Sequence, residues 1–206
     1  MNFAEAMAEL PLVAILRGVR PDEVEAVGAA LVAEGFRLIE VPLNSPDPFV
    51  SIARLQAAFG DRAVIGAGTV IRSEDVDRLA ATGARLCVSP HTDVCVIRQA
   101  RQAGLIALPG AATPSEGFAA LAAGADALKL FPAEAMPPAV VKAWRAVLPR
   151  EVALLPVGGV TPESMAAWRA AGAGGFGLGS ALYKPGMGAA DVAVRARAFV
   201  SAWRTG

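Results

Sequence analysis

Short apolar runs recur along the chain at a nearly constant spacing. Eight such runs start roughly 20 to 27 residues apart, which is the length of one strand–loop–helix–loop unit. Near-continuous runs of Val, Ile, Leu and Ala are typical of strands that are buried on both faces. We therefore predict parallel strands at residues 12–16, 38–41, 63–67, 85–88, 105–108, 127–131, 153–157 and 176–178.

Alanine-rich segments of helical period lie between the apolar runs. We predict helices at residues 22–34, 73–82, 114–123 and 162–171. A helix that ends in the left-handed conformation favours glycine, and a glycine precedes five of the strands: Gly35, Gly83, Gly104, Gly124 and Gly172. Thr113-Pro114-Ser115-Glu116 is a capping box with Pro at the first helical position, and Thr161-Pro162 indicates a second helix start with the cap and Pro but without the box.

Eight alternating strands and helices predict an α/β fold of the (β/α)8 TIM barrel type. Residues 3–10 form an amphipathic segment, and we expect a short N-terminal helix there that covers one end of the barrel. No linker or charge block interrupts the pattern, so we expect residues 1–206 to form a single domain. The alternative is an open, doubly wound parallel sheet.

Composition narrows the function classes. The chain is 54% hydrophobic, and its 19 basic residues balance its 19 acidic ones, so we expect no nucleic-acid or membrane partner. No signal core precedes the first strand, which favours a cytoplasmic location with Cys87 and Cys95 reduced. With His91 as the only histidine, a His-rich metal site is excluded, and we expect metal-independent chemistry without a cofactor.

Lys129 and Glu40 are charged residues that lie inside predicted strands. Alternation places Lys129 on the opposite face from Leu128 and Leu130, so its amine points into the barrel if the leucines pack against helices. Burial there favours the neutral, nucleophilic amine. Glu40 points inward in the second strand and is a candidate proton shuttle. The alternative is a structural ion pair across the barrel.

Other polar groups and glycines follow strand ends. Arg17 ends the first strand in the inward register and suits a bidentate carboxylate contact. Thr69 follows the glycine-containing third strand. Two small-residue turns end the last two strands, where this fold commonly binds phosphate on backbone amides; their residues are Gly158, Gly159, Gly179 and Ser180.

Together these residues resemble the 2-keto-3-deoxy-6-phosphogluconate / 6-phosphogalactonate aldolase family over nearly the whole chain. The matching motifs are IEV (39–41), GAGTV (66–70), LKLFPA (128–133), VGGV (157–160) and GLGS (177–180). The resemblance implies that Lys129 forms a Schiff base and Glu40 acts as general acid and base. It also implies a homotrimer, phosphate binding by the two turns, and a substrate site that includes Arg17, Asn44, Thr69, Pro90 and Phe131.

One departure indicates the branch of the family. The phosphogluconate-type pattern has an Arg-Thr pair where this chain has Asn44 and Ser45, so its usual carboxylate-binding arginine is missing and Arg17 takes that role. We therefore expect class I cleavage of a phosphorylated keto-deoxy sugar acid of the galactonate type to pyruvate and glyceraldehyde 3-phosphate. The alternatives are the phosphogluconate or 4-hydroxy-2-oxoglutarate substrate, a phosphate-binding barrel isomerase, and a catalytically silent sugar-phosphate-binding barrel.

Overall fold

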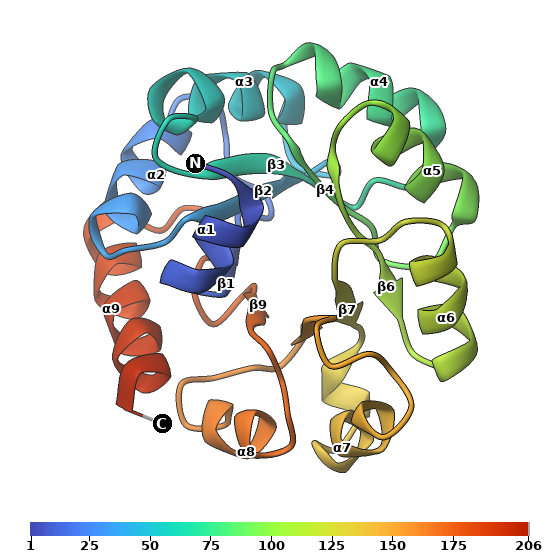
Figure 1. Ribbon diagram of the computed structural model, residues 1–206. Coiled ribbons are helices and arrows are strands. Elements are labelled where there is room, and N and C mark those ends of the chain that lie inside the picture. The colour runs from blue at the N-terminus through green and yellow to red at the C-terminus, as the bar shows by residue number, and fades with distance from the viewer. Residues whose placement is uncertain (206) are drawn as a thin grey trace.

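The computed structural model describes residues 1–205, in which strands and helices alternate (Figure 1). The strands are β1 (Leu12–Ile15), β2 (Leu38–Pro42), β3 (Val64–Gly68), β4 (Leu86–Val88), β5 (Ile106–Leu108), β6 (Gly110–Ala111), β7 (Leu128–Leu130), β8 (Leu154–Pro156) and β9 (Phe176–Leu178). The helices are α1 (Phe3–Glu9), α2 (Val24–Ala33), α3 (Pro48–Phe59), α4 (Ser73–Ala81), α5 (Val94–Gln102), α6 (Pro114–Ala122), α7 (Ala139–Arg145), α8 (Met165–Ala170) and α9 (Ala189–Thr205), with a 3-10 turn η1 (Ala133–Ala135).

The strands form a curled parallel sheet. One part has the order β5-β4-β3-β2-β1-β9 and the other the order β6-β7-β8, and every pairing is parallel. The two parts meet along the chain at Pro109, between β5 and β6, and an isolated bridge joins Val157 to Gly177. Helices α2 to α9 surround the strands, so the fold has an inner layer of strands and an outer layer of helices (Figure 1).

Side chains on the two faces of the strands pack into different clusters. Residues that point toward the inside form a small apolar layer at the start of the strands: Val13, Leu38, Val64, Leu86, Leu108, Ala127 and Leu155. Ala6 of α1 is fully buried against this layer. The opposite faces form the larger cluster under the helices, so both faces of each strand are apolar, as its sequence predicts.

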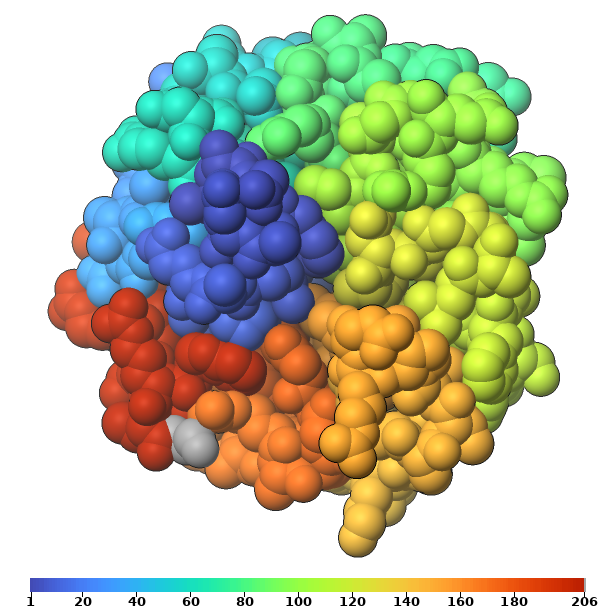
Figure 2. Space-filling model, in the orientation of Figure 1, coloured from blue at the N-terminus to red at the C-terminus, as the bar shows by residue number. Residues whose placement is uncertain are grey.

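Helix α1 covers one end of the strands. Its Asn2–Glu5 capping box fixes the start of the helix, and the Arg85 side chain donates a hydrogen bond to the carbonyl of Met1. In the space-filling view the N-terminal segment, in dark blue, occupies the middle of the visible face (Figure 2). The predicted N-terminal helix is confirmed.

Most local predictions are confirmed. Each predicted strand is found to within one residue at each end, and the five glycines after helices all have positive φ, between 74° and 105°. The capping box at Thr113 is present. The predicted start of α8 is wrong: the helix begins at Met165, and Thr161 and Ser164 bond each other in a turn before it. None of the helices in residues 1–205 is both long and apolar enough to cross a membrane.

Candidate active site

The carboxyl-terminal ends of β1, β7, β8 and β9 surround a cavity of about 570 Å³, which we call the main cavity. Below it, a narrow chamber continues between the strands toward the inner apolar layer, and both Lys129 and Glu40 line this chamber. Predicted residues that line the main cavity are Arg17, Lys129, Phe131, Gly158, Gly159, Gly179 and Ser180.

Lys129 is in β7, between Gly110 of β6 and Leu155 of β8. Its neighbours Leu128 and Leu130 are fully buried under the helices, so the predicted alternation is confirmed and the lysine points inward. The side chain is only 6% exposed, and its Nζ lies 4.7 Å from the centre of the Phe131 ring. Burial lowers the pKa of this amine, which favours the neutral form that attacks ketones.

Glu40 is in β2, and its carboxyl group is 1% exposed. Gly68 of β3 makes room for it, because a Cβ at that position would lie 1.9 Å from Glu40 Oε2. This oxygen has no hydrogen-bond partner among residues 1–205. Burial raises the pKa of Glu40 to about 7, although the charges of Lys129 and Arg17 oppose the rise. Such a carboxyl group can both give and accept a proton near neutral pH.

Lys129 and Glu40 face one chamber without forming a direct ion pair. Within the described part of the chain, no nitrogen–oxygen contact of 4.0 Å or less joins their side chains. The Glu40 charge raises the pKa of Lys129, whereas burial and Arg17 lower it. The geometry therefore does not support the alternative of a structural ion pair, and it places an amine and a carboxyl group on the wall of the same chamber.

Arg17 lines the main cavity and contacts two other predicted residues, Asn44 and Thr69, which do not line it. Its guanidinium donates to Asn44 Oδ1 at 2.5 Å and to Thr69 Oγ1 at 3.5 Å. Thr69 has a left-handed backbone with φ of 57°, which is uncommon for a non-glycine residue and costs energy. The structure thus brings Arg17, Asn44 and Thr69 together at the ends of β1, β2 and β3.

Pro90 follows β4, which β3 separates from the Glu40 strand β2, and it does not line the main cavity. Its carbonyl oxygen lies against Gly110, where a Cβ would approach to 2.3 Å, and Gly110 is the register partner of Lys129. Pro90 is therefore in contact with the strand that carries the lysine's neighbour. His91 follows in the same loop with its side chain about half exposed.

The two small-residue turns lie on the same rim of the main cavity. Gly158 and Gly159 have positive φ values of 113° and 66°, a conformation that favours glycine. Gly179 has open space at its Cβ position, and Ser180 follows it on the cavity wall. These turns can present backbone amides to an anion.

Other polar residues line the main cavity that the sequence did not single out. They are Glu134, Thr161, Tyr183, Lys184 and Arg195. Lys184 and Arg195 add positive charge near the turns, as an anion site requires. The glycines of the two nearby turns stand out in the sequence. Charged residues in loops and on helices are ordinarily solvent-exposed, so nothing in the sequence distinguished these cavity residues from other surface residues.

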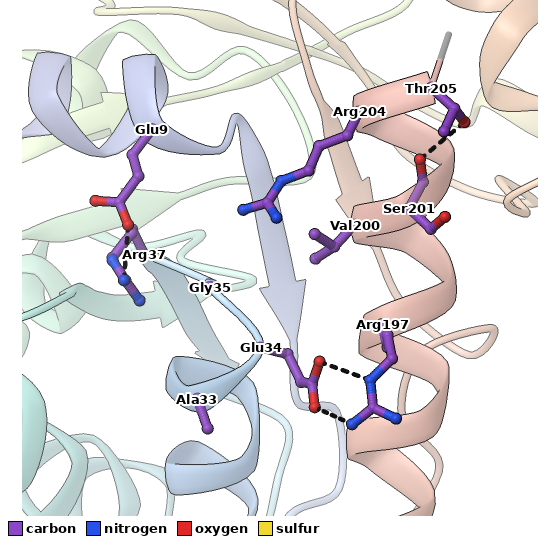
Figure 3. Close-up of a pocket in the computed structure, with 10 residues that line it drawn as sticks. All are labelled: Glu9, Ala33, Glu34, Gly35, Arg37, Arg197, Val200, Ser201, Arg204 and Thr205. Carbon is purple, nitrogen blue, oxygen red and sulfur yellow. Dashed lines mark hydrogen bonds and ion pairs between the residues drawn. The ribbon is translucent and has the colours of Figure 1, made fainter.

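A second cavity of about 570 Å³ lies between α1, the end of α2 and the end of α9 (Figure 3). Its charges are mostly paired: Arg37 contacts Glu9 at 2.6 Å, and Arg197 contacts Glu34 through two bonds. Arg204 extends into the space between these pairs (Figure 3). Helix carboxyl ends are negative and attract arginine, so this cluster has a structural explanation.

The cysteines and acidic residues form no metal-type cluster in residues 1–205. No three His, Cys, Asp or Glu side chains come together there. Cys87 is a buried free thiol and Cys95 an exposed one. Both cysteines are therefore unpaired, as the sequence predicts.

Comparison with known proteins matches this arrangement to a family. The family model described as "KDPG and KHG aldolase" matches residues 3–196. The chain is 50% identical over 196 residues to a 2-dehydro-3-deoxy-6-phosphogalactonate aldolase of Escherichia coli, which covers 95% of this chain and 96% of that protein. It is also 50% identical over 195 residues to a probable enzyme of the same name from Rhizobium meliloti.

Solved structures give the same result. A structure described as "Native KDPGal structure" superposes with a TM-score of 0.94 at 50% identity, over 96% of both chains. The 2-keto-3-deoxy-6-phosphogluconate aldolase of Zymomonas mobilis superposes with a TM-score of 0.85 at 25% identity, over 98% of this chain and 97% of that one. The chain therefore belongs to the KDPG and KHG aldolase family.

Proposed function

We propose that this protein is a class I aldolase that cleaves 2-dehydro-3-deoxy-6-phosphogalactonate to pyruvate and D-glyceraldehyde 3-phosphate. The observation that carries the proposal is the buried, unpaired Lys129 and Glu40 in one chamber beneath two glycine turns. The 50% identity to enzymes of that name supports the choice of substrate.

In this reaction the neutral Lys129 amine attacks the C2 ketone, and loss of water gives an iminium that withdraws electrons from C3. Glu40, directly or through a water molecule, accepts the proton of the C4 hydroxyl as the C3–C4 bond breaks, which releases the aldehyde. The same carboxyl group then returns a proton to C3 of the enamine. Hydrolysis of the resulting imine releases pyruvate and restores the amine.

The remaining residues hold the ends of the substrate. Arg17, oriented by Asn44 and near Thr69, binds the carboxylate, and the Phe131 ring covers one side of the amine. Gly158, Gly159, Gly179 and Ser180 bind the phosphate, with Lys184 and Arg195 adding charge. Pro90 supports the site through Gly110 rather than by lining the main cavity.

Trapping with pyruvate and sodium borohydride tests the covalent step. The chain has three lysines, Lys129, Lys142 and Lys184, and reduction of the imine should add one lactyl group to Lys129 alone. Lys142→Ala serves as the matched control, because Lys142 is in α7 and does not line either the main cavity or the chamber. Absence of added mass, or labelling of another lysine, would contradict the aldolase mechanism and favour an isomerase or a silent barrel.

The epimeric substrate separates the two branches of the family. Relatives named for the phosphogluconate substrate are more distant, at 30% identity for the KHG/KDPG aldolase of Escherichia coli over 156 residues. We expect kcat/KM for the galactonate epimer to exceed that for the gluconate epimer by about tenfold or more. A reversed ratio would assign the protein to the other branch.

We also propose that residues 1–206 form one closed (β/α)8 barrel domain that assembles as a cytoplasmic homotrimer. The bridge between Val157 and Gly177 and the short break at Pro109 support closure. A designed cage described as a fusion of symmetric oligomeric domains superposes with a TM-score of 0.94 at 50% identity, which supports an oligomer. Light scattering of the purified protein should give three times the chain mass; a monomer mass would contradict the trimer.

A further inference from the structure

Glu134 is the only acidic residue among the described residues that line the main cavity. The other charged residues there are Arg17, Lys129, Lys184 and Arg195. A cavity for a doubly anionic substrate gains from these positive charges, whereas a carboxylate repels the substrate's own charges. Glu134 is solvent-exposed, so water can solvate its carboxylate in the free protein, and a hydrogen-bond donor on a bound substrate would offset this repulsion.

Glu134 lies against one of the two proposed phosphate turns. It is in η1, directly after the strand that carries Lys129. A Cβ at Gly158 would lie 1.7 Å from Glu134 Oε2, and a Cβ at Gly159 would lie 3.1 Å from the Cβ of Glu134. The carboxylate is thus packed directly on this turn, on the side where it lines the cavity.

The Glu134 carboxylate has no partner within the protein. Among residues 1–205 its side chain makes no ion pair within 4.0 Å and no hydrogen bond. An ionised carboxylate only accepts hydrogen bonds, so it can satisfy its oxygens in the cavity with a donor from a ligand or water. Phosphate and carboxylate groups of a substrate supply no such donor when ionised.

The proposed substrate has two hydroxyl donors, at C4 and C5, and this step rests on the proposed function. The C4 hydroxyl gives its proton to Glu40 during cleavage, which leaves the C5 hydroxyl. C5 is bonded to the carbon that carries the phosphate, so its hydroxyl reaches the rim at the phosphate turns rather than the Lys129 chamber. Glu134 lies at that rim.

We propose that Glu134 accepts a hydrogen bond from the C5 hydroxyl and makes the enzyme specific for aldehydes with a hydroxyl next to the carbonyl. A site that positions an acceptor for a hydroxyl favours a substrate that carries this hydroxyl over an analogue that lacks it, because the analogue leaves the acceptor without its donor. In the aldol direction this hydroxyl is the one on C2 of glyceraldehyde 3-phosphate.

Aldol addition of pyruvate to two aldehydes tests the inference. The aldehydes are D-glyceraldehyde 3-phosphate and 3-phosphooxypropanal, which differ only in that hydroxyl. We expect the wild-type protein to prefer glyceraldehyde 3-phosphate by about 10- to 100-fold in kcat/KM. Glu134→Ala should lose most of this preference through a fall with glyceraldehyde 3-phosphate, while kcat/KM for the deoxy aldehyde stays within about twofold.

Two further variants define the effect. Glu134→Gln keeps an oxygen acceptor and should retain part of the preference, while Glu151→Ala removes an exposed carboxylate outside the cavity and should change neither rate. Equal losses with both aldehydes, or an unchanged preference in Glu134→Ala, would overturn the inference. Borohydride trapping of wild-type protein with pyruvate separates the cases: its failure removes the aldolase proposal, whereas its success with an unchanged preference removes only the role of Glu134.

Discussion

The two ends of the strand bundle differ in whether their charged side chains form ion pairs. At the amino-terminal end, the cavity between α1, α2 and α9 holds arginines that are matched by Glu9, Glu34 and helix carboxyl ends (Figure 3). At the carboxyl-terminal end, Lys129 and Glu40 are more deeply buried and have no ion-pair partner within 4.0 Å in residues 1–205.

Two cavities of equal volume therefore differ in what their charges do. Paired charges near the surface contribute modestly to stability and perturb reactivity little. Buried groups without direct partners lower stability but acquire shifted pKa values, which is the condition for chemistry. The position of the buried charged groups that lack an ion-pair partner in residues 1–205, rather than cavity size, identifies the end of the fold that carries the reaction.

The largest expected effect is the loss of Lys129. Lys129→Met removes the nucleophile but keeps an unbranched side chain in the apolar surroundings, so kcat should fall on the order of 10⁴-fold or more. The rate of pyruvate release from the sugar acid measures this loss, and borohydride trapping shows whether the imine still forms. A residual rate within tenfold of the wild-type value would place the nucleophile elsewhere.

Glu40→Gln should act next most strongly on turnover. It keeps the shape of the side chain but removes the proton shuttle, and kcat should fall about 10²- to 10⁴-fold. The Glu40 charge raises the pKa of Lys129, so its removal should lower that pKa further. The pH midpoint of pyruvate trapping should then shift to lower pH in the variant; an unshifted midpoint would show that the two groups are not coupled.

The same substitution should raise stability at alkaline pH. Burial raises the pKa of Glu40 in the folded protein to about 7, above its ordinary value of 4.5, so the folded protein binds this proton more tightly than the unfolded chain. The unfavourable contribution of the buried charge is absent below about pH 4.5, grows between about pH 4.5 and 7, and is fully present above 7. Urea unfolding should show Glu40→Gln more stable than wild type by about 1 to 3 kcal/mol at pH 9, with a much smaller difference at pH 5.

The smallest expected effect lies at the paired end, with the opposite sign. Arg37 contacts Glu9 and donates to the carbonyls of Val32 and Phe36 at the end of α2. Arg37→Ala should lower the free energy of unfolding by about 1 to 2 kcal/mol and leave kcat/KM within about twofold. A larger loss of activity than of stability would mean that this end also takes part in the reaction.

Strands and helix ends followed directly from local chemistry, because alternation and glycine caps are decided within a few residues. β6 escaped prediction because Gly110–Ala111 is short and Pro109 interrupts the apolar run. The start of α8 was misplaced because Thr161-Pro162 has the composition of a helix cap, while Ser164 closes a turn there instead.

Only part of the candidate site could be predicted from the sequence, and the reason differs from the one that limited the fold prediction. Lys129 and Glu40 interrupt apolar strands, so their charge is anomalous in the sequence itself. Glu134, Lys184 and Arg195 are in loops or on a helix face, where charge is ordinary, and only the folding of distant segments brings them to the cavity. The sequence predicts Pro90 in the substrate site. Its contact with Gly110 could not be predicted, because that contact depends on how neighbouring strands approach each other.

Helix α1 packs against the inner apolar layer, and the reactive chamber lies between that layer and the main cavity. In the proposed reaction, the fragment attached to the amine sits deeper than the phosphorylated fragment. The aldehyde is released when the C3–C4 bond breaks, whereas pyruvate stays attached to Lys129 until the imine is hydrolysed, so the covalent bond and the depth of the site give the same order of release. Product-inhibition kinetics should accordingly have the pattern of an ordered release, with pyruvate last.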